Sequence, residues 1–115
     1  HELLHVAKVE ARAMFDAGYR APRKTLIPVV GRYGVATMSA QLVNMRDGGF
    51  ISAHDYKLAS MIASVVSGGD IEPGSLVDEQ WLLDLERKAF MELLNHPKTH
   101  ERIMGMMQTG KPVRN

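Results

Sequence analysis

The chain has 115 residues, which is enough for one compact domain. Apolar residues make up 45% of the chain and charged residues 23%, the balance of a folded protein rather than a disordered one. Lys and Arg number 14 and Asp and Glu number 13, so the net charge is +1. This near-neutral balance gives no electrostatic reason to expect nucleic acid or an anionic membrane surface as a partner.

Three features that the sequence lacks narrow the class of protein further. Cysteine is absent, which excludes disulfides and thiolate chemistry and fits a reducing compartment. No apolar run approaches the roughly 20 residues that a membrane-spanning helix needs, and the first residues lack the pattern of a signal peptide. The sequence starts with histidine, inside a helical pattern with no cap before Leu3, so we expect a fragment of a longer protein.

The first half of the chain predicts a helix followed by a long connection. Apolar residues at helical spacing predict a helix from Glu2 to about Ala17, and Gly18 fits the left-handed position that ends it. Residues 19–32 contain two prolines and show no helical period. We therefore predict a packed loop that is extended in places, since Pro28 cannot donate a hydrogen bond to a sheet.

Two helices are predicted next, over residues 33–45 and 53–67. Ser52 and Asp55 have the spacing of a capping box, although Glu or Gln is usual where Asp55 stands. The glycine pairs at 48–49 and 68–69 are expected to stop these helices; neither follows an apolar strand or precedes a Lys-Ser/Thr pair, so neither fits a phosphate loop. The inward side chains are expected to be Val35, Met38, Leu42 and Met45 on the first helix, and Leu58, Met61, Ile62 and Val65 on the second.

The last third of the chain holds the strongest helical pattern. A fourth helix is predicted to start near Val77 or Asp78, with Ser75 or Asp78 as its cap. Its apolar face is wide, which indicates contacts on two sides; the face comprises Leu82, Leu83, Leu85, Ala89, Phe90, Leu93 and Leu94. A fifth helix is predicted to start at Pro97, capped by Asn95 or His96, and to end at Gly110 before an extended tail over 111–115.

The predicted fold class is therefore all-α, with about five helices joined by short Gly/Pro loops in a single helical domain over 1–115. Two histidine patterns contain residue types that can form a site. Asp55 is expected to cap a helix beside an exposed His54, because adjacent helical residues point in different directions and do not form a proton relay. His96 and His100 have a spacing that can hold zinc, but no third ligand is evident, so two solvated histidines are the preferred interpretation. We predict no catalytic residue and no metal site.

Two further groups of side chains could either bind a ligand or have an ordinary structural role. The basic residues of the connection could contact a phosphate group, or they could simply be solvated; they are Arg20, Arg23, Lys24 and Arg32. Met104, Met106 and Met107 could fill a core, which is the usual role of methionine, or contact a flat aromatic ring.

An ordered set of short motifs resembles the C-terminal end of bacterial fusion proteins that carry 3-hydroxyacyl-CoA dehydrogenase and enoyl-CoA hydratase modules. The motifs are residues 18–22 (GYRAP), 48–55 (GGFISAHD), 68–70 (GGD), 83–90 (LDLERKAF), 98–103 (KTHERI) and 109–115 (TGKPVRN). Each motif is weak by itself, but their order covers essentially the whole chain.

This resemblance implies a helical C-terminal part of a crotonase-type module in a cytoplasmic enzyme of fatty acid β-oxidation. Such an enzyme hydrates trans-2-enoyl-CoA and oxidises 3-hydroxyacyl-CoA with NAD. The family's catalytic and NAD-binding residues lie upstream of this segment, so the resemblance implies that this chain binds no cofactor of its own. It implies packing against upstream crotonase and dehydrogenase domains, contacts in a homo-oligomer, and a cover over the CoA of the substrate.

By position, Lys111 matches a lysine that lies near the CoA adenine in that family, and Met106 stands where an aromatic residue is common. Thr109 and Gly110 replace the two basic residues that precede the lysine, which is a departure from the pattern. The alternative interpretation is a stand-alone helical module that binds a partner protein. A DNA-binding helix-turn-helix domain is disfavoured, because it needs a basic recognition helix.

Overall fold

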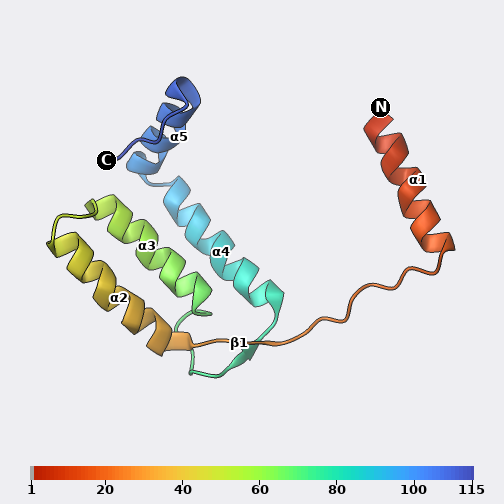
Figure 1. The fold of residues 1–115 in the computed structure, drawn as a ribbon, viewed down its shortest axis with the longest axis horizontal. Helices are drawn as coiled ribbons and strands as arrows, with labels where there is room; N and C mark the ends of the chain where they lie inside the picture. The colour runs from red at the N-terminus through yellow and green to blue at the C-terminus, as the bar shows by residue number, and fades with distance from the viewer. Residues whose placement is uncertain (1) are drawn as a thin grey trace.

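A computed structural model describes residues 2–115, which form five helices and two very short strands, so the all-α prediction is confirmed (Figure 1). The elements are α1 (Glu2–Asp16), β1 (Ile27–Pro28), α2 (Gly31–Asp47), α3 (Ala53–Val66), β2 (Leu76–Val77), α4 (Glu79–Leu94) and α5 (Pro97–Thr109). No helix in the described part of the chain is long and apolar enough to cross a membrane.

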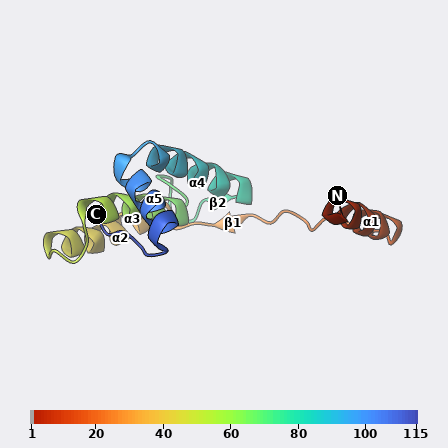
Figure 2. The same ribbon diagram turned by 90° about the horizontal axis from the view of Figure 1, so that it is seen from above.

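Helices α2, α3 and α4 lie side by side, with α3 packed between the other two (Figure 1). Helix α5 follows α4 after a short turn, and the chain then returns along α5 so that its last residue lies near the first turn of that helix. Helix α1 lies apart from this group in both views, at the end of an extended segment (Figures 1 and 2).

Helices α3, α4 and α5 start at capping residues that the sequence indicates. Ser52 and Asp55 form the predicted capping box: the Ser52 hydroxyl accepts a hydrogen bond from the Asp55 amide at 3.0 Å, and the Asp55 carboxylate accepts one from the Ser52 amide at 3.2 Å. Asp78 caps α4 by accepting a hydrogen bond from the Trp81 amide at 2.8 Å. His96 caps α5, and Gly110 ends that helix in the left-handed conformation, with φ of 66°.

The connection before α2 differs from its prediction as a packed loop. Residues 17–28 are all exposed, and burial begins at Val29. Ile27 and Pro28 pair antiparallel with Val77 and Leu76, which Pro28 tolerates because this two-stranded ribbon leaves its nitrogen free of ladder bonds. Helix α2 also starts two residues earlier than predicted, at Gly31.

A small core forms where the start of α2, the end of α3 and the two strands meet. Its buried apolar side chains are Val29, Ala63 and Val77, and Ser67 is completely covered. The backbone closes this region, because the Gly31 amide donates to the Ser67 carbonyl at 2.8 Å and the Val29 amide donates to the Ser75 carbonyl at 3.0 Å.

Much apolar surface remains outside this core. Met45 and Ile62 were expected to point inward but are 42% and 52% exposed, so these two assignments are wrong. The reason is that the contacts between neighbouring helices cover only part of each helix's circumference, and the predicted stripes are wider than these contacts. On α1, Leu3 is 83% exposed and Phe15 is 74% exposed, because no other element packs against that helix's apolar face.

Candidate functional site

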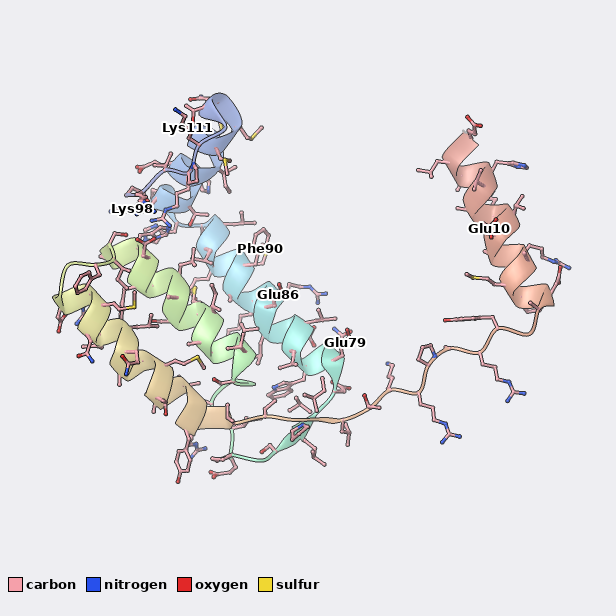
Figure 3. All side chains as sticks on the ribbon, in the orientation of Figure 1. Glu10, Glu79, Glu86, Phe90, Lys98 and Lys111 are labelled. Atoms are coloured by element: carbon pink, nitrogen blue, oxygen red, sulfur yellow. The ribbon has the colours of Figure 1, made fainter. Side chains whose placement is uncertain are left out.

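The tail residues singled out by the sequence lie on the exposed end of α5. Met106 is about half exposed, and Lys111 is exposed just beyond the left-handed Gly110. The Lys111 amide donates a hydrogen bond to the Thr109 hydroxyl at 3.1 Å, which fixes the backbone where the tail turns. Figure 3 places Lys111 at the end of α5 opposite to Lys98, far from the other helices.

An ion pair and a set of amide contacts hold the tail against α5 and α5 against α3. Arg102 on α5 forms an ion pair of 2.8 Å with Asp55 in the first turn of α3. The same guanidinium donates to the Asn115 side-chain oxygen at 2.7 Å and to its backbone oxygen at 3.2 Å. The Asn115 amide in turn donates to the Lys98 carbonyl at 3.1 Å and to a Glu101 carboxylate oxygen at 2.6 Å. These contacts fix the direction in which Lys111 is presented.

The charge on Asp55 is favoured by this arrangement. The hydrogen bond from Arg102 lowers the pKa of the Asp55 carboxyl, and the hydrogen bond from the Ser52 amide lowers it further. Asp55 therefore caps α3 and anchors α5 with the same carboxylate, and the sequence predicted the first of these roles alone.

His54 was expected to be exposed, and the structure corrects this: its side chain is 2% exposed. It lies in the first turn of α3 and contacts the start of α5: its Nε2 is 3.3 Å from the Thr99 hydroxyl, and its ring centroid is 4.6 Å from that of His96. Burial is the main cause of a lowered pKa for His54, with Arg102, His96 and Lys98 adding repulsion. The signal was in the sequence, since His54 precedes Leu58 and Met61 at helical spacing on the inward stripe.

His96 and His100 do not converge on a metal position. The His96 ring faces His54, whereas the Nε2 of the exposed His100 contacts the Leu94 carbonyl oxygen. Within residues 2–115, no group of three or more His, Cys, Asp or Glu side chains is arranged to hold a metal ion.

The basic residues of the connection are divided between two places. Arg20, Arg23 and Lys24 are exposed along the extended segment, and Arg23 and Lys24 line a cavity of ≈ 580 Å³ beside the start of α4. Arg32 lies on α2 and pairs with Asp70 at 3.4 Å and Glu72 at 3.0 Å, so its charge is already partly compensated. A phosphate contact by these four residues stays a prediction.

An apolar groove runs along the exposed side of α3 and α4, and we call it the α3–α4 groove. It has a volume of ≈ 280 Å³ and is lined by Met61, Ile62, Val65, Val66, Glu86, Ala89, Phe90 and Leu93. Figure 3 shows Phe90 and Glu86 one turn apart on α4. Ile62, Val66 and Phe90 are each more than half exposed, so this face has the composition of a surface that packs against further protein.

Comparison with known proteins gives one informative match. No protein family model matches the chain, and no solved structure matches it. The chain is 40% identical over 113 residues to a part of the probable 3-hydroxyacyl-CoA dehydrogenase of Bacillus subtilis. This alignment covers 98% of the chain but 14% of the relative, so the chain is similar to one segment of a much longer protein.

Proposed function

We propose that this chain is the helical region of a longer, cytoplasmic fatty acid β-oxidation enzyme. The parent enzyme would be an NAD-dependent 3-hydroxyacyl-CoA dehydrogenase that also carries a crotonase-type enoyl-CoA hydratase module. The observation that carries the dehydrogenase part of the proposal is the 40% identity, along 98% of this chain, to a protein named as a probable 3-hydroxyacyl-CoA dehydrogenase. The hydratase module is proposed from the motif resemblance. We assign no catalytic residue to the chain itself, so NAD and the chemical steps belong to upstream domains.

The role that we propose for the chain within the parent enzyme is packing. Helix α1 and the α3–α4 groove both present large apolar side chains to solvent, including Leu3, Phe15, Ile62 and Phe90. Large apolar side chains that are exposed together are typical of protein contacts. Upstream domains of the same chain, and contacts within a homo-oligomer, would cover it.

A second role concerns the CoA of the substrate. Lys111 and Met106 lie close together in sequence at the exposed end of α5, and the contacts of Arg102 and Asn115 hold the tail in a fixed direction. The Lys111 ammonium could pair with a CoA phosphate, and the Met106 thioether could contact the adenine ring. Helix α5 would then act as a cover over part of the CoA.

Lys111→Ala in the parent enzyme tests the CoA role. The apparent KM for acyl-CoA should rise roughly two- to fivefold, the loss expected of one solvent-accessible ion pair. The kcat should stay nearly unchanged, because the contact is shared by the ground state and the transition state. Lys88→Ala, which removes an exposed lysine of α4, serves as the matched control. A fall in kcat with an unchanged KM would contradict the role.

Assays of the intact parent protein test the activity. We expect reduction of NAD with a 3-hydroxyacyl-CoA and hydration of a trans-2-enoyl-CoA by the same protein. Dehydrogenase activity without hydratase activity would remove the crotonase part of the proposal. The absence of both activities would favour the alternative, a helical module whose apolar surface binds a partner protein.

A further inference from the structure

The contact between α3 and α5 is built around a buried histidine with unequal surroundings at its two ring nitrogens. The Nε2 of His54 lies 3.3 Å from the Thr99 hydroxyl, which can accept or donate a hydrogen bond. The Nδ1 is buried and has no hydrogen-bond partner among the residues that the structure describes. A neutral imidazole fits this site, because its single N–H can point to Thr99 and leave a bare nitrogen at Nδ1.

A protonated imidazole does not fit the same site. The imidazolium carries an N–H on both nitrogens, so in either orientation of the Thr99 hydroxyl the Nδ1–H would be a buried donor without an acceptor. The charge would also lie at the positive end of α3, since His54 is in the first turn of that helix.

The charged groups around His54 also favour the neutral ring over the protonated one. Helix α5 brings Arg102 and Lys98 toward the His54 ring, and the turn before α5 brings His96 toward it. Each of these three groups disfavours a positive charge on His54. On α3 itself, Asp55 favours that charge, but its carboxylate is already paired with Arg102 at 2.8 Å. The surroundings therefore favour the neutral ring as long as α5 stays in place.

We propose that the docking of α5 and the C-terminal tail on α3 requires a neutral imidazole at His54, and that protonation of His54 releases them. Release would free Arg102 from Asp55 and move the tail that carries Lys111. The inference follows from the α3–α5 contact alone, so it does not depend on what the parent enzyme catalyses.

The direction of the pH response follows from linkage. Burial and the neighbouring cations lower the pKa of His54 in the docked state, so the undocked state binds the proton more readily. Docking is then fully stable above the ordinary histidine pKa of about 6.5 and weakens as the pH falls below that value. The ratio of docked to undocked protein should fall by up to roughly tenfold for each pH unit.

Hydrogen exchange of the intact protein tests this inference. Peptides from α5 and the tail are compared at about pH 7.5 and about pH 5.5, on the two sides of the ordinary histidine pKa, after correction for the intrinsic pH dependence of exchange. Peptides from α2 and α3 serve as the internal reference. We expect protection of α5 and the tail to fall roughly tenfold at the lower pH, while α2 and α3 stay protected.

Two variants identify the group that titrates. His54→Phe places a somewhat larger aromatic ring that cannot be protonated at this position, so its α5 protection should not depend on pH in this range. His5→Gln, which changes an exposed histidine of α1, should retain the response of the unmodified protein. A response that survives His54→Phe, or one that disappears in His5→Gln, would overturn the assignment to His54.

A measurement on the unmodified protein covers the case in which His54→Phe does not fold. The ring protons of His54 are followed by NMR as the pH is lowered, together with the amides of α5. We expect His54 to stay neutral in the docked form. The NMR signals of the α5 amides should change over the same pH range as those of the His54 ring. An ordinary titration near pH 6.5 with α5 still protected would show that a protonated ring is tolerated at this contact.

Discussion

At the scale of single residues, Asp55 has two partners that belong to different parts of the chain. Its carboxylate accepts a hydrogen bond from the Ser52 amide at 3.2 Å, which caps α3, and it pairs with Arg102 of α5 at 2.8 Å. A sequence pattern predicts the first contact because it is local. The second contact depends on how α5 packs, so no spacing rule indicates it.

Asp55→Asn should lower the free energy of unfolding by about 1 kcal/mol at neutral pH, because the ion pair is partly exposed and solvent screens it. The pKa of Asp55 is lowered from 3.8 in the folded state, so its contribution is present above about pH 4 and is lost as the pH falls through the folded-state pKa. Chemical denaturation at several pH values measures the difference.

Asp47→Asn provides the matched control, since Asp47 is exposed and pairs with its neighbour Arg46. This change should alter the free energy of unfolding by no more than about 0.5 kcal/mol. Equal effects at the two positions, or an Asp55 effect that persists in acid, would contradict the role of the Arg102 pair.

At the scale of elements, the start of α2 is fixed by one glycine. Gly31 has a φ of 57° and is buried, and its amide donates to the Ser67 carbonyl at 2.8 Å. A side-chain carbon at this position would overlap the Ile71 backbone carbonyl and would lie 3.1 Å from the carbonyl carbon of Glu72. Gly31 therefore permits both the left-handed turn into α2 and the close approach of the loop after α3.

Gly31→Ala should lower the free energy of unfolding by roughly 2–3 kcal/mol or more, since strain at φ is combined with a clash against backbone. Gly49→Ala separates the two causes, because Gly49 has a φ of 73° with open space around it. That control should lose about 1 kcal/mol, which is the cost of the left-handed conformation. Thermal or chemical unfolding compares the two, and equal losses would exclude the clash.

At the scale of the whole molecule, the chain is extended. Its radius of gyration is 19.8 Å, whereas a compact domain of about this size has roughly 13 Å. The cause is visible in Figure 1, where α1 stands apart from α2–α5 at the end of an exposed segment. The prediction of a single domain over 1–115 depends on what covers α1 and stays a prediction.

Limited trypsin digestion of the separate chain should therefore cut first at Arg20, Arg23 and Lys24, which lie in the exposed connection between α1 and β1. Mass spectrometry identifies the products, and sites within α2–α5 should be cut later. In the intact parent enzyme the same three sites should be cut more slowly if upstream domains cover α1 and its connection. Equal rates in the two proteins would count against that packing.

The features that depend on nearby residues were determined by the sequence itself. The number of helices, the Ser52–Asp55 capping box and the stop at Gly110 all follow from short-range backbone hydrogen bonds and from the conformational freedom of glycine. The sequence narrowed the caps of α4 and α5 to two candidates each, and the structure selects Asp78 and His96. Helical spacing also identified half-buried residues such as Leu85 and Leu93 correctly.

The tertiary structure decided which part of each apolar stripe is covered, and what surrounds each polar group. Met45 and Ile62 are exposed although they lie on predicted inward stripes, and Asp55 is paired with Arg102 from another helix. The early start of α2 at Gly31 likewise depends on a loop far along the chain. The physical reason is common to these cases: burial, ion pairing and the pKa of a side chain depend on residues that become neighbours through packing, and such contacts leave no fixed spacing in the sequence.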